Sequence, residues 1–200
     1  YISSEVNRVN VLVSRFLDFA RPLTLERREV ALAPLLDRAL ADAQGRWPQS
    51  RVRVERDYAA DALPKLALDA TLCQRAFANL AANAYEAMDA MDAMDGRTAD
   101  DGGESRLWVS AAAAREAGQP GVVVTFRDTG PGVPAELREQ IFNPFFTTKP
   151  SGTGLGLAIV SKIVDQHGGQ LRLRQEAGAG AVFEVFLPAA PAVGDGTSVY

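Results

Sequence analysis

The stretch NLAANAYEAM, residues 79–88, lies within an apolar helical pattern, and three further polar or glycine-rich blocks follow it along the chain. These blocks are DTGPGV at 128–133, NPFFTTK at 143–149 and GTGLGL at 152–157. Asn79 and Asn83 are four positions apart, so both amides leave the same face of one helix and can contact one ligand. Each block alone indicates little, but the four in this order predict a pocket for a purine nucleotide.

The helix that carries both asparagines is predicted to begin after the capping residue Asp69 and to end near Met88. Its buried face is formed by Leu72, Ala76, Phe77, Leu80, Ala84 and Ala87. Residues 87–104 then contain the repeat AMDAMDAMDG followed by DDGGE. We expect a frayed helix end there, followed by a solvated loop.

Further strands and helices are predicted on both sides of this helix. On the N-terminal side they are a strand at 29–32, a helix with Pro34 in its first turn, and a strand at 51–56. On the C-terminal side they are strands at 106–112 and 121–127 joined by a turn at 118–121, a helix at 155–166, and a hairpin formed by 170–174 and 181–187. The long Gly-, Pro- and Thr-rich segment 130–156 is typical of a functional lid or a disordered linker.

The first 22 residues carry apolar side chains at spacings of 4, 3, 4, 3 and 4, namely Ile2, Val6, Val9, Val13, Phe16 and Ala20. This spacing is the seam of a coiled coil or a four-helix bundle. An isolated helix of about 20 residues is marginal in water, so this one needs a partner helix and the chain looks cut from something longer. The expected parts are therefore this helix (1–22), a compact domain (23–188) and a disordered tail (189–200).

The composition excludes several classes of function. The chain has 21 Lys and Arg against 25 Asp and Glu, so we expect neither nucleic-acid binding nor direct membrane contact by this fragment. The single Cys73 excludes a disulfide framework and a cysteine-based zinc cluster, and we expect it to be buried. No run of about 18 apolar residues occurs and no signal peptide opens the chain. We expect a soluble cytoplasmic fragment, whose longer parent could be anchored in a bacterial inner membrane.

Asp128 follows an apolar strand, and Gly130 and Gly132 permit a tight backbone and close approach of a ligand. A carboxylate in this place can accept a hydrogen bond from an exocyclic amine such as N6 of adenine. The residues alone leave two alternatives open. Asp-Thr-Gly suits an ordinary Asx turn. It is also the catalytic tripeptide of aspartic proteases, which would require a homodimer here to supply the second carboxylate.

The loop 151–156 leads into a predicted helix, so the unpaired N–H groups of that helix N-terminus can face phosphate oxygens. It matches neither a Walker A motif nor the G-x-G-x-x-G dinucleotide motif. Lys149 could be a mobile cation for the terminal phosphate, or an ordinary solvated lysine. The amide oxygens of Asn79 and Asn83 suit Mg²⁺, which bridges phosphate oxygens; the alternative is a pair of buried amides bonded to backbone.

The four blocks resemble the N, G1, F and G2 boxes of sensor histidine kinases, in the ATPase superfamily shared with gyrase, Hsp90 and MutL, over about residues 29–188. The resemblance implies an α+β fold, a two-layer α/β sandwich of the Bergerat type, with helices on one face of a mixed sheet. ATP would lie between the N-box helix and the lid. The resemblance implies that Asn83 holds Mg²⁺, that Asn79 supports the metal and phosphates, and that Asp128 binds adenine. Gly154 and Gly156 would contact the phosphates, and Lys149 could supply charge to the terminal phosphate. The remaining implied nucleotide-binding residues are Gly130, Gly132, Thr153 and Leu155, and Phe145 and Phe146 would pack the lid.

The same resemblance implies phosphoryl transfer rather than hydrolysis. Hydrolysing relatives have a glutamate where this chain has Asn79, and an amide cannot act as a general base. Asn79 and Lys149 are the implied catalytic residues, acting by positioning and by charge stabilisation. Residues 4–22 resemble the second helix of the dimerisation hairpin of nitrogen-regulation sensors, and the acceptor histidine belongs on the first helix. The only histidine, His167, resembles the family's usual turn, so we expect ATP binding without autophosphorylation of this chain alone.

The implied partners are the kinase's own dimerisation domain, within a homodimer, and a cognate response regulator. Three features depart from the family pattern: Glu86 replaces a frequent cation, Ala181 replaces a threonine, and the AMD repeat lengthens the loop after the N-box helix. The alternatives are a protein-serine kinase of the anti-sigma or mitochondrial dehydrogenase-kinase type, and an ATP-gated binding module without transfer activity.

Overall fold

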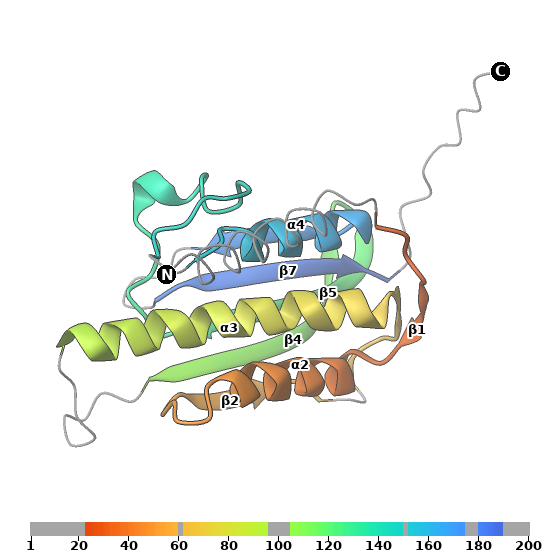
Figure 1. Cartoon of the computed structure of the whole chain (residues 1–200). Helices are drawn as coiled ribbons and strands as arrows, with labels where there is room; N and C mark the ends of the chain where they lie inside the picture. Colours follow the sequence, from red (N-terminus) through yellow and green to blue (C-terminus); the bar gives the residue numbers. More distant parts are fainter. Residues whose placement is uncertain (1–22, 60–61, 96–104, 150–151, 175–179, 190–200) are drawn as a thin grey trace, which may run out of the picture.

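The computed structural model describes residues 23–59, 62–95, 105–149, 152–174 and 180–189 (Figure 1). Its elements are β1 (Arg28–Val30), α2 (Leu32–Arg46), β2 (Arg53–Asp57), β3 (Leu66–Leu68), α3 (Ala70–Asp95), β4 (Arg106–Glu116), β5 (Gln119–Asp128), a short 3-10 helix (Ala135–Leu137), α4 (Gly156–Gln166), β6 (Gln170–Arg174) and β7 (Val182–Pro188). The helix predicted over 1–22 and the tail after residue 189 lie outside the described residues.

Two layers make up the domain. Five strands form a mixed sheet in the order β2-β4-β5-β7-β6, in which β2 and β4 are parallel and the other neighbours are antiparallel. Helices α2, α3 and α4 cover one face of this sheet (Figure 1). The short strands β1 and β3 form a separate antiparallel pair. The predicted α+β sandwich with helices on one face is therefore confirmed.

The central helix α3 is fixed over the central strand β5 by the core. Val122, Val124 and Phe126 alternate along β5 and are all buried, as expected for the inner face of a strand. Phe77 of α3 stacks on Phe126 with ring centroids 6.0 Å apart. Burying one such side chain contributes about 1.5–3 kcal/mol. The position of the asparagine-bearing face of α3 is therefore set by apolar packing on its opposite side.

Helix α3 is longer than the sequence predicted. The helix continues to Asp95, so the prediction that it frays beyond Met88 is wrong for residues 89–95. Residues 96–104 lie outside the described part. The extension has hydrogen-bond partners from distant segments. Ser50 donates to Asp89 at 2.8 Å, and Ser105 donates to Asp92 at 3.1 Å. The acidic repeat thus attaches the neighbouring segments to the helix.

Two other boundaries differ from the prediction. The strand expected at 29–32 ends at Val30, and Leu32 already opens α2. Strands β4 and β5 are longer than expected because the chain reverses at Ala117 and Gly118, with φ of 47° and 83°, rather than at 118–121. Positive φ at both central residues is the geometry of a two-residue hairpin turn.

A buried hydrogen-bond cluster joins the start of α3 to the end of α4. Asp69 accepts from the N–H of Leu72 at 3.1 Å, which confirms the predicted helix cap. His167 accepts from the N–H of Asp69 through Nε2 at 3.0 Å, and its Nδ1 donates to the carbonyl of Ile163 at 2.7 Å. These contacts agree with the structural role expected of His167. Cys73 is also buried, as predicted, and burial raises the pKa of its thiol to about 12.

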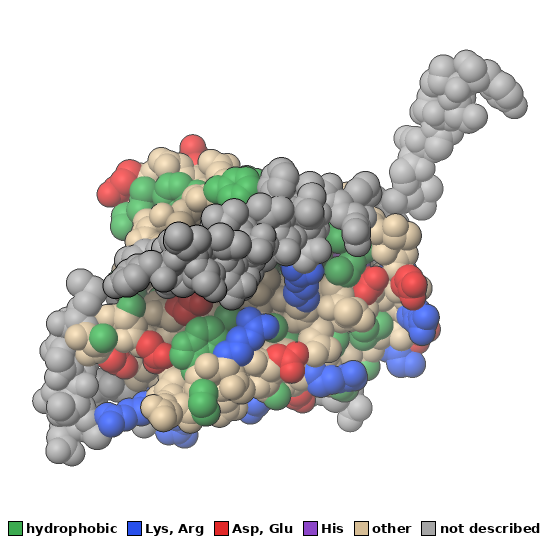
Figure 2. Space-filling view, in the orientation of Figure 1, with side chains coloured by type: hydrophobic (Ala, Val, Ile, Leu, Met, Phe, Trp, Pro, Cys, Tyr) green, Lys and Arg blue, Asp and Glu red, His purple; other side chains and the backbone are tan. Residues whose placement is uncertain are grey.

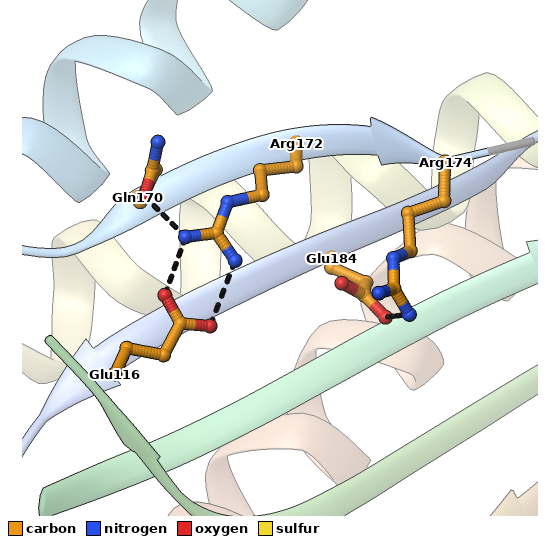
Figure 3. A network of polar contacts seen from close by, with 5 residues as sticks. All are labelled: Glu116, Gln170, Arg172, Arg174 and Glu184. Carbon is orange, nitrogen blue, oxygen red and sulfur yellow. Dashed lines mark hydrogen bonds and ion pairs between the residues drawn. The ribbon is translucent and has the colours of Figure 1, made fainter.

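The outer face of the sheet carries a polar network. Glu184 follows the inward-facing Phe183 on β7, so its side chain points away from the helices. Figure 3 shows Arg172 between Glu116 and Gln170, and Arg174 beside Glu184. Arg172 contacts both carboxylate oxygens of Glu116. This bidentate pair braces the end of β4 against β6.

On the face shown in Figure 2, basic and acidic side chains are intermixed rather than gathered by sign. Within the described ranges, no helix is both long and apolar enough to span a membrane.

Candidate functional site

The candidate site begins with Asp128, the last residue of β5, whose side chain is 4% exposed. Its Oδ1 accepts from the N–H of Gly130 at 2.8 Å and from the N–H of Ala181 at 3.1 Å. Its own N–H donates to the carbonyl of Ala181 at 3.1 Å, and its carbonyl accepts from Gly180 at 3.0 Å. Burial raises the pKa of Asp128, and the two backbone donors oppose this rise. The carboxylate is thus held in one orientation.

Two glycines let the backbone pack directly against this carboxylate. A Cβ on Gly180 would lie 2.2 Å from Asp128 Oδ1, and a Cβ on Gly130 would lie 2.9 Å from the same atom. Neither position can therefore carry a side chain in this arrangement. Sequence reasoning included Gly130 among the site residues but missed Gly180, for which the only signal was the glycine-rich run before the closing strand. Gly132, with φ of 73°, follows in the turn after β5. We call the end of β5 at Asp128, together with Gly130, Gly180 and Ala181 that pack on it, the wall of the site.

Ala181 stands where the family pattern has a threonine, and it still contacts Asp128. Its contact with Asp128 uses the backbone N–H, which any residue except proline supplies. Replacing a threonine by alanine at this position therefore keeps the hydrogen bond that orients the carboxylate.

Asn79 and Asn83 lie on α3, and both side chains are partly exposed. This exposure disfavours the alternative of two fully buried amides. Asn83 Oδ1 lies 3.9 Å from the place that a Cβ of Gly156 would occupy. Gly156 is the first residue of α4, so the fold brings the N-terminus of α4 beside Asn83. An amide oxygen and unpaired backbone N–H groups therefore meet at one place, which suits a phosphate group and its cation.

The loop that leads into α4 is tightly folded. Gly154 has φ of 64°, and a Cβ there would lie 2.3 Å from the carbonyl carbon of Phe145. The N–H of Phe145 donates to the carbonyl of Gly154 at 2.9 Å. Thr153 is partly exposed in this loop, and Leu155 is buried as the residue before α4.

The segment from Asn143 to Lys149, which we call the lid, lies between the wall and α4 in sequence and carries apolar and basic side chains. Phe145 is 54% exposed, whereas Phe146 is partly buried. The ammonium group of Lys149 forms an ion pair with the carboxylate of Glu86 on α3. The sequence pattern had left Lys149 as either a phosphate cation or a solvated lysine, and its partner Glu86 lies on the same helix as the two asparagines.

Asn83 carries an amide oxygen, the kind of ligand that Mg²⁺ prefers. In the part of the chain that the structure describes, no group of three or more His, Cys, Asp or Glu side chains could hold a metal ion. Mg²⁺ prefers oxygen ligands and usually keeps water molecules and phosphate oxygens. One amide oxygen, that of Asn83, fits an ion that arrives with phosphates.

The aspartic-protease alternative requires a second carboxylate sharing a proton with Asp128. Among the described residues, the hydrogen bonds of the Asp128 side chain come from the backbone N–H groups of Gly130 and Ala181. The arrangement orients a single carboxylate and does not support that alternative.

The comparisons with known proteins agree with this geometry. The family model described as histidine kinase-, DNA gyrase B-, and HSP90-like ATPase matches residues 68–191. The chain belongs to this family. The match includes the asparagine helix, Asp128, the lid and the loop before α4.

Relatives within this ATPase family include sensor histidine kinases. The sensor histidine kinase ZraS of Salmonella typhimurium is 32% identical over 191 residues, covering 94% of this chain and 37% of the relative. The catalytic domain of histidine kinase ThkA, in a nucleotide-free form, matches with a TM-score of 0.66 and 28% identity over 83% of this chain and 97% of that one. Full-length ShkA in complex with AMPPNP matches with a TM-score of 0.72 and 26% identity over 94% of this chain and 37% of that one. The chain thus spans little more than a third of ZraS.

Proposed function

We propose that this chain is the catalytic, ATP-binding part of a sensor histidine kinase, which transfers the γ-phosphoryl group of ATP to a histidine on a dimerisation hairpin. One observation carries the proposal: a buried, oriented carboxylate lies on the wall of the site, while an asparagine on α3 lies beside the N-terminus of α4. The first feature suits an adenine amine, and the second suits phosphates. ShkA, which binds the ATP analogue named with its structure, has the same fold.

Each residue has a defined task in this proposal. Asp128 accepts from the adenine amine, and the N–H of Gly130, which packs closely on the carboxylate, holds it in place. The loop at Gly154 and the first N–H groups of α4 hold phosphate oxygens. Asn83, supported by Asn79, would hold Mg²⁺, which when bound neutralises phosphate charge. Lys149 supplies a positive charge from the lid.

Asn79 favours transfer over hydrolysis. An amide cannot remove a proton from water, so this position provides no general base, and the phosphoryl group passes to an external acceptor. We further propose that the acceptor belongs to the kinase's own dimerisation domain in a homodimer, that a response regulator receives the group next, and that the domain acts in the cytoplasm.

Calorimetry with ATP, ADP and GTP, with and without Mg²⁺, tests the pocket. We expect a preference for adenine nucleotides and a dependence on Mg²⁺ that Asn83→Ala removes. Absence of nucleotide binding by the wild-type chain would refute the proposal.

A second candidate is an ATP-gated binding module without transfer activity, favoured by the ion pair that engages Lys149 with Glu86. Addition of a purified dimerisation hairpin with its histidine separates the two candidates. Transfer of labelled phosphate to the hairpin supports the kinase, and ATP binding without transfer supports the module. Acid-stable phosphoserine in the acceptor would instead indicate a serine kinase of the same fold.

A further inference from the structure

The ion pair between Glu86 and Lys149 joins α3 to the lid across 63 positions of sequence. Glu86 lies three residues after Asn83, so both side chains leave the same side of α3. The pair therefore lies next to the place where we propose that the phosphates bind. Its side chains are 39% exposed for Lys149 and 42% exposed for Glu86.

A carboxylate at this place has an electrostatic cost for a site that receives a polyanion. The triphosphate of ATP and Glu86 have the same sign of charge, and like charges at short range repel. Lys149 of the lid neutralises Glu86 through this ion pair, and its own backbone N–H donates to Thr147 Oγ1 at 3.1 Å. When a triphosphate enters, its terminal oxygens compete with Glu86 for the same ammonium group.

The exposure of the pair makes such an exchange possible. A partly exposed ion pair between single groups contributes little to stability because water screens it. A phosphate group offers several charged oxygens to the same lysine and forms stronger, charge-assisted hydrogen bonds. Transfer of Lys149 from Glu86 to a phosphate therefore requires breaking only a weak contact.

We propose that Glu86 is a positioning residue that holds Lys149 against α3 in the nucleotide-free protein and releases it to the terminal phosphate of the bound nucleotide. This inference rests on the proposed function of the pocket and adds a residue to it. Glu86 then determines how strongly the site distinguishes a triphosphate from shorter nucleotides. Lys149 is held near the phosphate site, and ATP binds more weakly because the ion pair with Glu86 must first break.

The test is a double-mutant cycle on the whole chain, with calorimetric titration of ATP, ADP and adenosine in the presence of Mg²⁺. We expect Glu86→Gln to tighten ATP binding by about two- to fivefold, the size expected of an exposed ion pair, to affect ADP less and to leave adenosine unchanged. Lys149→Met should weaken ATP binding. In the Lys149→Met background, Glu86→Gln should lose at least half of its effect, because the competition no longer exists.

Glu139→Gln is the matched control, since Glu139 is an exposed carboxylate shortly before the lid. It should leave all three affinities unchanged. Hydrogen exchange of the peptide 143–149 gives a second measurement without nucleotide. Glu86→Gln should speed exchange there, and Glu139→Gln should not.

The outcomes separate the inference from the proposed function. If the wild-type chain binds ATP as proposed but Glu86→Gln leaves ATP affinity unchanged or weakens it, the inference alone is wrong. An equal or larger tightening by Glu86→Gln in the Lys149→Met background would show simple repulsion between Glu86 and the phosphates and would also overturn it. If the wild-type chain binds no nucleotide, both proposals fail.

Discussion

Asp128, in the wall of the candidate pocket, is 4% exposed and hydrogen-bonded through its carboxylate and through both of its backbone groups. Phe145, in the lid, is 54% exposed, and its contacts include a backbone hydrogen bond to Gly154 at 2.9 Å and close packing against that glycine. The wall is part of the paired sheet, whereas the lid is a connection between elements. A carboxylate held by several hydrogen bonds suits recognition of a planar base, and a more exposed connection suits contact with phosphates that enter and leave.

The charged pairs of the sheet and of the lid differ in the number of contacts that each makes. On the outer face of the sheet, Arg172 holds both oxygens of Glu116 and also contacts Gln170 (Figure 3). At the lid, one ammonium group meets one carboxylate oxygen. A bidentate pair between strands fixes geometry, whereas a single contact can exchange its partner.

The largest expected difference between the two regions concerns stability. Phe77→Ala removes the ring that stacks on Phe126 under the wall, so we expect the free energy of unfolding to fall by about 3–5 kcal/mol. The same substitution in the lid, Phe145→Ala, should change it by less than about 0.5 kcal/mol because the ring is exposed. Urea denaturation measures both values. Equal losses would show that the exposed ring of Phe145 contributes as much to stability as the buried ring of Phe77, against this prediction.

Asp128→Asn sharpens the comparison at the level of binding. The amide oxygen can keep the hydrogen bonds from Gly130 and Ala181, so the fold should persist. The adenine amine loses a charged acceptor, which costs about 1.5–3 kcal/mol, or about ten- to a hundredfold in ATP affinity. Calorimetry measures the affinity, and a thermal melt confirms folding. Unchanged ATP affinity in a folded variant would remove Asp128 from the adenine site.

Gly118 and Gly154 both have positive φ, but only Gly154 packs against the lid. Gly118→Ala, in the hairpin turn with open space around it, should cost about 1–2 kcal/mol of stability and leave ATP binding unchanged. Gly154→Ala places a Cβ 2.3 Å from Phe145, so the lid must shift. We expect a loss of stability at least as large there, because Gly154 also has positive φ and the new Cβ meets backbone atoms, together with about fivefold weaker ATP binding, roughly 1 kcal/mol. Denaturation and calorimetry on both variants test this; identical effects on binding would contradict it.

The sequence predicted features that depend on neighbours along the chain. The cap at Asp69, the helix that follows it and the closing hairpin come from periodicity and from turn or capping residues, which are local signals. The length of α3 was not predicted because it depends on Ser50 and Ser105, which reach it only in the folded protein. A three-residue acidic repeat by itself gives no sign of those partners.

In the candidate site too, some residues could be found from local sequence signals and others could not. The blocks indicated Asn83, Asp128 and Gly154, because their residue types and spacing are unusual. The Glu86–Lys149 pair and the role of Gly180 depend on contacts between segments far apart in sequence. The assignments of Asp128 to adenine and of Asn79, Asn83, Lys149 and the loop at Gly154 to metal and phosphate stay predictions, which the binding experiments test.

The smallest expected effect is a pH dependence of stability where His167, after α4, contacts Asp69 at the start of α3. Burial lowers the pKa of His167 below its usual 6.5, and Arg27 lowers it further, while the bond to Ile163 and the charge of Asp69 oppose this. The unfolded chain therefore binds a proton more readily than the folded one. The contribution of His167 to the unfolding free energy is complete above about pH 6.5 and is lost as the pH falls through the lower folded pKa. Since the chain has 1 histidine, NMR titration of its imidazole reports this pKa directly, and a midpoint at or above 6.5 would contradict the prediction.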